Sequence, residues 1–64
     1  MNLWYQHEID SLRPLAAKIY SGKMTYYRAC KDWRSSRSFE SIRSKLKRLV
    51  AELRRRDLLL RKEH

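Results

Sequence analysis

The residues of this sequence that are able to do chemistry are few and scattered. Cys30 is the only cysteine, and the two histidines, His7 and His64, stand near opposite ends of the chain. A structural zinc site needs four nitrogen or sulfur ligands, and a cysteine nucleophile needs a neighbouring base. Glu8 and Asp10 resemble an acid pair, but the helix dipole also favours acidic residues at a helix start. We therefore expect no catalytic residue, no metal site and no cofactor, and we interpret Cys30 as a small buried hydrophobe.

Lysine and arginine dominate the charge of the chain. There are 16 of them against 7 aspartates and glutamates, which gives a net charge of +9. Such an excess repels itself in the free protein, and a polyanionic partner relieves that repulsion. Nucleic acid is the commonest partner of this kind, ahead of an anionic membrane surface or an acidic protein.

The length and composition predict one small helical domain. The 64 residues are 42% hydrophobic, enough for a single core, and one glycine and one proline are too few for a strand-and-turn architecture. A lone cysteine permits no internal disulfide, which suits a reducing compartment. No apolar run approaches about 20 residues, and no signal-peptide pattern is present. We expect a single all-α domain over residues 1–64, no membrane span, and a cytoplasmic location at the nucleoid or in a host cell.

Hydrophobic periodicity predicts a first helix over residues 4–20. Its apolar face is made by Trp4, Leu12, Leu15 or Ala16, and Ile19. Pro14 lies inside this stretch and removes a backbone hydrogen bond, so we expect either a kink or the start of a second short helix there. Ser21 and Gly22 should end the segment, because Gly22 is free to adopt a left-handed conformation.

A short second helix is predicted over residues 25–33, with Thr25 suited to cap its start. Its apolar stripe consists of Tyr26, Ala29, Cys30 and Trp33. Tyr27 lies off this stripe, so we expect it to face solvent or a partner. Trp4 and Trp33 are interpreted as core residues, because each supplies a large share of the buried area in so small a domain.

The clearest helix is the third, over residues 39–62, and Ser38 is a suitable N-cap for it. Its apolar stripe recurs by three and four at Phe39, Ile42, Leu46, Leu49 and Leu53. Such a helix is about 36 Å long. We expect a core over residues 4–53, which is too small to cover the whole helix. The extension over residues 54–64 should therefore project, fray, fold back on the first helix or meet a second subunit. A homodimer interface would use Leu53, Leu58, Leu59 and Leu60.

The side of the third helix opposite its leucines combines small polar residues with long cations. Ser41 and Ser44 permit close approach to base edges, and the arginines and lysines around them reach phosphate or guanine. Arg34 and Arg37 lie in the turn before the helix, where we expect them to hold the DNA backbone. This pattern is typical of a helix that enters a DNA groove.

Three features occur here in a combination known from one family. They are Trp4 with Glu8 and Leu12 in the first helix, Gly22 before the second, and the string RSFESIRSKL at residues 37–46. With them the chain resembles Myb/SANT-like and related homeodomain-like helix-turn-helix domains over residues 4–50. Pro14 and the bulky second helix depart from the family pattern. The resemblance implies a three-helix homeodomain-like helix-turn-helix bundle with a long C-terminal helix lying in the major groove.

The resemblance also implies which side chains approach the DNA. Those nearest the bases would be Ser41, Ser44, Lys45 and Arg48. Those nearest the phosphates would be Arg34, Arg37, Arg43 and Lys47. Some members of this family bind proteins such as histone tails instead, so the resemblance leaves both classes of ligand open.

The sequence therefore favours a binding module over an enzyme. The first hypothesis is a protein that binds double-stranded DNA, with or without sequence specificity, as a small transcriptional regulator of a bacterium or phage. The second is a protein-interaction module or inhibitor that docks on an acidic host protein through Tyr26, Tyr27 and residues 58–60. RNA binding, with exposed tyrosines stacked on bases, ranks third.

Overall fold

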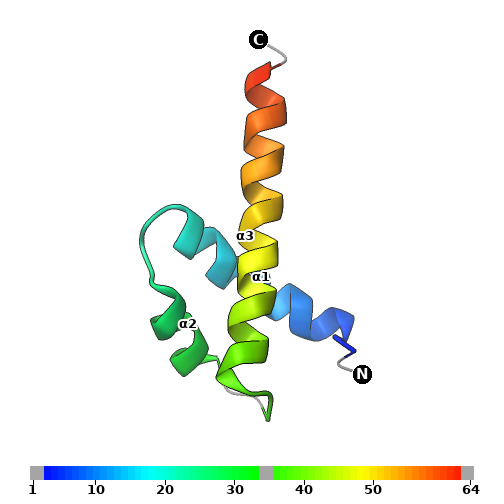
Figure 1. Cartoon of the computed structure of the whole chain (residues 1–64), viewed down its shortest axis with the longest axis vertical. Coiled ribbons are helices and arrows are strands. Elements are labelled where there is room, and N and C mark those ends of the chain that lie inside the picture. Colours follow the sequence, from blue (N-terminus) through cyan, green and yellow to red (C-terminus); the bar gives the residue numbers. More distant parts are fainter. Residues whose placement is uncertain (1–2, 34–35, 63–64) are drawn as a thin grey trace.

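Three helices build the protein, and the third is much longer than the other two. The computed structural model describes residues 3–33 and 36–62, and no strand occurs within these ranges. The helices are α1 (Gln6–Tyr20), α2 (Tyr26–Asp32) and α3 (Phe39–Lys62). α1 crosses behind α3, α2 lies beside the first turns of α3, and the last turns of α3 project beyond both (Figure 1). Within the described ranges, no helix is long and apolar enough to cross a membrane.

Local capping interactions set where the helices begin and end. The Thr25 hydroxyl accepts a hydrogen bond from the backbone N–H of Arg28 at 3.1 Å at the start of α2. The Ser38 hydroxyl accepts one from the backbone N–H of Ser41 at 3.2 Å at the start of α3. Gly22 has a φ of 80°, the left-handed conformation that follows the end of α1. The predicted caps and the predicted role of Gly22 are confirmed.

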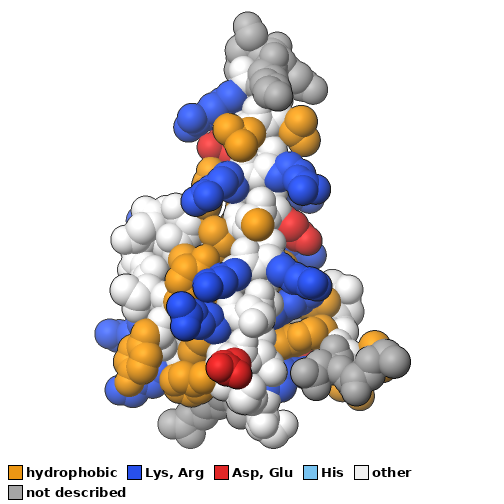
Figure 2. Space-filling view, in the orientation of Figure 1, with side chains coloured by type: hydrophobic (Ala, Val, Ile, Leu, Met, Phe, Trp, Pro, Cys, Tyr) orange, Lys and Arg blue, Asp and Glu red, His pale blue; other side chains and the backbone are white. Residues whose placement is uncertain are grey.

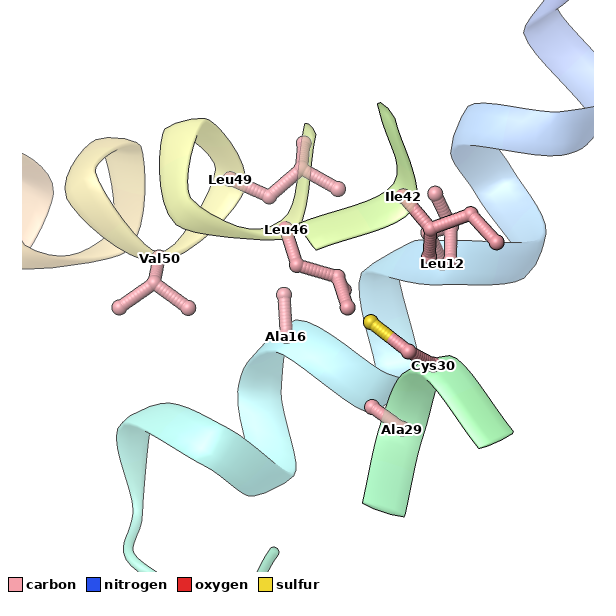
Figure 3. Packing of buried hydrophobic residues seen from close by; sticks show 8 residues of the cluster. All are labelled: Leu12, Ala16, Ala29, Cys30, Ile42, Leu46, Leu49 and Val50. Carbon is pink, nitrogen blue, oxygen red and sulfur yellow. The ribbon is translucent and has the colours of Figure 1, made fainter. Parts of the chain in front are cut away.

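The core lies where α1 and α2 pack against one side of α3. Its buried side chains are Leu12, Ala16, Ala29, Cys30, Ile42, Leu46, Leu49 and Val50 (Figure 3). Leu12, Ile42 and Leu46 are the largest that are completely buried. Trp4 and Trp33 are half-buried and pack against this core. The predicted stripe of α3 is thus confirmed at its centre, and Leu53 is half-buried at its end.

The structure excludes one of the two alternatives for Pro14 and corrects the prediction for Phe39. α1 is continuous through Pro14, so no second helix begins there. Pro14 and Asp10 are both exposed, and water can bond the Asp10 carbonyl that the proline leaves unpaired. Phe39 is not buried, because the first residue of α3 lies beyond the crossing with α1. Its side chain is 52% exposed and packs edge-on against Tyr27, with 6.3 Å between the ring centroids.

The contact between α1 and α3 ends near Asp57. The Tyr20 hydroxyl at the end of α1 donates a hydrogen bond to the Asp57 carboxylate at 2.9 Å, and this bond raises the pKa of Tyr20. Beyond it, Leu58, Leu59 and Leu60 are 53%, 57% and 63% exposed. The prediction that these leucines fold back on the first helix is therefore wrong.

We expect Leu46→Ala to destabilise the fold by about 2–5 kcal/mol, because it opens a cavity in a fully buried site. Leu58→Ala removes the same atoms from an exposed site and should change the stability by less than about 0.5 kcal/mol. Urea denaturation followed by circular dichroism measures both effects. Equal midpoints for the two variants would contradict this description of the core.

Candidate nucleic-acid interface

The side of α3 that faces away from the core is exposed along its length. Because Ile42, Leu46 and Leu49 are buried, the opposite side of the helix must lie in water. The exposed residues of that side include Ser44, Lys47, Arg48, Ala51 and Arg55. Figure 2 looks onto this side and shows lysine and arginine side chains on both sides of the helix axis.

The four residues predicted to face the bases lie together. A shallow groove on α3 is lined by Ser41, Ser44, Lys45 and Arg48, with Trp4 and Glu40 as its remaining walls. Ser44 and Arg48 are exposed, whereas Ser41 and Lys45 are half-buried. Sequence reasoning missed Trp4 and Glu40 as parts of this groove. The periodicity of α3 places Glu40 beside Ser44, but no sequence signal brings the segment before α1 to this side of α3.

The residues predicted to face phosphate differ in their exposure and in their ion pairs. Arg43 and Lys47 are exposed on one flank of α3, and neither forms an ion pair within the described part of the chain. Lys45 and Arg48 on the other flank likewise form no ion pair within these residues. Arg34 lies outside the described residues. The cations on the first half of α3 therefore form no ion pair within the described residues, although Glu40 lines the same groove as Lys45 and Arg48.

Arg37 has a structural environment that argues against the phosphate role predicted for it. Its guanidinium donates two hydrogen bonds to the Glu8 carboxylate, each 2.8 Å long, and a further one to the Leu3 carbonyl. It also lies over the Trp4 ring, 4.0 Å from the centroid. The Arg37 side chain is only 16% exposed. Arg37 is therefore removed from the set proposed to contact phosphate, because its Nε and Nη2 donors are already bonded to Glu8 and Leu3.

The Arg37–Glu8 pair joins the turn before α3 to the first turn of α1. Hydrogen bonds from Arg37 and from the Tyr5 backbone N–H lower the pKa of Glu8 from 4.5 to about 2. The same pairing raises the pKa of Arg37. Glu8 also completes the start of α1, since its carboxylate accepts the Tyr5 N–H at 3.0 Å. Glu8 and Asp10, which the sequence suggested as an acid pair, thus have different partners. Asp10 accepts a hydrogen bond from Gln6 and forms an ion pair with Arg13, both on its own helix.

The two tryptophans pack against each other beside the groove that Trp4 helps to line. Their ring centroids are 6.0 Å apart, and the indole N–H of Trp33 donates a 2.8 Å hydrogen bond to the Ser11 hydroxyl. These contacts hold Trp33 against α1. Tyr27, in contrast, is 66% exposed, as predicted from its place off the apolar stripe of the second helix.

Cys30 lies in the core and its surroundings do not activate it. Burial raises the pKa of the thiol, which keeps it in the protonated, weakly nucleophilic form. Its sulfur lies 3.9 Å from the Phe39 carbonyl. Among the described residues, no three or more histidine, cysteine, aspartate or glutamate side chains gather as a metal site would require.

No family model, no curated protein and no solved structure matches this chain. The resemblance to Myb/SANT-like domains therefore stays a prediction from sequence. A function must be inferred from the geometry of α3, whose outer face combines hydroxyl groups with cations that lack described acidic partners.

We expect Glu8→Gln to destabilise the fold at neutral pH and to have little effect in acid. Because folding lowers the pKa of Glu8 from 4.5 to about 2, its carboxylate stabilises the folded state fully above pH 4.5. That contribution is lost as the pH falls toward 2. Urea denaturation at several pH values measures the difference between wild type and variant.

Asp10→Asn is the matched control, because Asp10 is an exposed carboxylate of the same helix whose partners are Gln6 and Arg13. It should cost less stability than Glu8→Gln at neutral pH. A gap between wild type and Glu8→Gln that is the same at about pH 7 and about pH 2 would contradict the assigned role of the ion pair.

Proposed function

We propose that this chain binds double-stranded DNA and that the first half of α3 enters the major groove. The observation that supports the proposal most is the outer face of α3, where Ser41 and Ser44 lie among Lys45, Lys47 and Arg48. None of these cations is paired with an acidic group in the described part of the chain. With a net charge of +9, the free protein gains by meeting a polyanion.

The dimensions of α3 and the types of its outer side chains suit the major groove of DNA. The major groove of B-DNA is about 12 Å wide and admits an α-helix with its side chains. Ser44 at the centre of the face and Ser41 at its edge keep the helix close to the base edges, where the Ser44 hydroxyl can donate or accept a hydrogen bond; the Ser41 hydroxyl already accepts one from Ser38 at 3.0 Å. Arg48 is long enough to reach the O6 and N7 acceptors of guanine, and Lys45 lies beside it on the same flank.

The flank formed by Arg43 and Lys47 is proposed to contact the phosphates. Both side chains are exposed on the flank of α3, and with the serines turned to the base edges they would meet the DNA backbone beside the groove. Arg34 remains part of the proposal from its position before α3, whereas Arg37 does not. A single module of this size buries about 600–1,000 Å² on DNA, which suits a weak or modestly specific regulator of transcription in a bacterium or phage.

Fluorescence anisotropy with labelled random-sequence duplex DNA at several salt concentrations tests the proposal. We expect the logarithm of the binding constant to fall linearly with the logarithm of salt concentration. Arg43→Gln and Lys47→Gln should each reduce that slope by about one, because each removes one phosphate contact. Ser44→Glu should weaken binding strongly, since it adds a second carboxylate to the face beside Glu40.

Arg13→Gln is the control for the loss of one positive charge. Arg13 lies on α1 near Asp10 and Glu52, 3.8 and 4.0 Å away, so its charge is already compensated. It should leave the salt slope unchanged. The proposal fails if Arg13→Gln and Lys47→Gln alter the slope equally, or if Ser44→Glu binds duplex DNA as wild type does.

A further inference from the structure

The outer face of α3 changes character after the proposed DNA-binding half. Toward the projecting end a second groove is lined by Ala51, Arg54, Arg55, Leu58 and Leu59, which we name the α3 groove. Figure 2 shows hydrophobic side chains between lysine and arginine side chains in this part of the helix. Leu58 and Leu59 are more than half exposed, and no described part of the chain covers them. Exposed apolar side chains that lie together are one of the features found at interaction surfaces.

The four leucines predicted to form a homodimer interface do not share one surface. Successive residues of an α-helix are rotated by about 100°, so Leu60 points away from Leu58 by about 160°. Leu53 is half-buried on the core side of α3, and Leu60 continues that side. A second copy docked on the α3 groove would therefore bury only Leu58 and Leu59.

The charge at the rim of the α3 groove also disfavours a second copy. Arg54 and Arg55 border the apolar strip and form no ion pair within the described residues. The nearby Asp57 is already bonded to Tyr20 and Arg61, at 2.9 and 3.4 Å. A two-fold pairing of this face would set the arginines of both copies against each other, and like charges across an interface repel.

We propose that the α3 groove docks an acidic amphipathic helix of another protein. Apolar side chains of that helix would cover Leu58 and Leu59, and its carboxylates would pair with Arg54 and Arg55. This is helix-in-groove recognition with charge complementarity at the rim. The docking does not depend on the proposed DNA binding, since Leu58 lies about 21 Å along α3 from Ser44.

The test is fluorescence anisotropy, without DNA, using a labelled synthetic amphipathic peptide with leucines on one face and glutamates beside them. We expect the full chain to bind this peptide and not to bind a version with lysine in place of glutamate. The double variant Leu58→Ser/Leu59→Ser should weaken binding at least about tenfold, which corresponds to 1.4 kcal/mol. Arg54→Gln/Arg55→Gln should weaken binding and reduce its dependence on salt.

Leu60→Ser is the matched control, because Leu60 is as exposed as Leu58 and Leu59 but lies on another side of α3. It should bind the acidic peptide like wild type. Circular dichroism of each variant establishes that the fold is retained. Equal binding by Leu58→Ser/Leu59→Ser and Leu60→Ser overturns the proposal, and so does equal affinity for the glutamate and lysine peptides.

Two further measurements test whether a second copy of the chain or a membrane surface occupies the α3 groove instead. Sedimentation equilibrium that reveals a dimer lost in Leu58→Ser/Leu59→Ser would assign the groove to a second copy. Co-sedimentation with phosphatidylglycerol vesicles that is lost in the same variant would assign it to an anionic membrane surface. Either result would overturn the proposal, and neither would affect the proposal that the chain binds DNA, because that surface lies elsewhere on α3.

Discussion

Leu12, Ile42 and Leu46 are completely removed from water, and they come from the two helices that cross at the centre of the protein. A domain of 64 residues has little other apolar surface to bury, so this contact contributes much of the free energy that offsets chain entropy. The same contact fixes the rotation of α3 about its own axis. Once its leucines face α1, Ser44 and its neighbouring cations must face water.

The Arg37–Glu8 ion pair adds a second constraint at the edge of that core. It connects residues 29 positions apart and holds the segment before α1 beside the first turn of α3. Because Arg37 is largely buried between Glu8 and Trp4, its charge is used within the fold and is not offered to a partner. The neighbouring cations on α3 lack such acids, which is why they and not Arg37 characterise the outer face.

Local signals were sufficient to predict the elements. Helix caps and helix ends can be predicted from sequence because they depend on groups within four residues, as at Thr25, Ser38 and Gly22. The apolar spacing of α3 likewise predicts which side is buried, and hence that Ser44, Lys47 and Arg48 face outward, whereas the set of Ser41, Ser44, Lys45 and Arg48 came from the family resemblance. What the sequence could not provide was tertiary: the partner of Arg37, the place of Trp4, and which of the alternatives for residues 54–64 occurs. Phe39 and residues 58–60 are exposed, although their residue types suit a core, because they lie outside the part of α3 that α1 and α2 cover.

In the two proposals, the charge of the outer face of α3 favours acidic partners, and the polar or apolar character of its centre distinguishes between them. Cations outnumber the acids Glu40 and Glu52 on this face, and the excess of positive charge favours an acidic partner. The centre of the face differs: hydroxyl groups at Ser41 and Ser44 suit hydrated base edges, whereas Leu58 and Leu59 gain free energy only when an apolar surface covers them. A nucleic acid has little apolar surface to offer at that end, and a purely hydrophobic peptide would leave Arg54 and Arg55 without counter-charges. Under the two proposals, the two halves of α3 thus present the same charge to two chemically different partners.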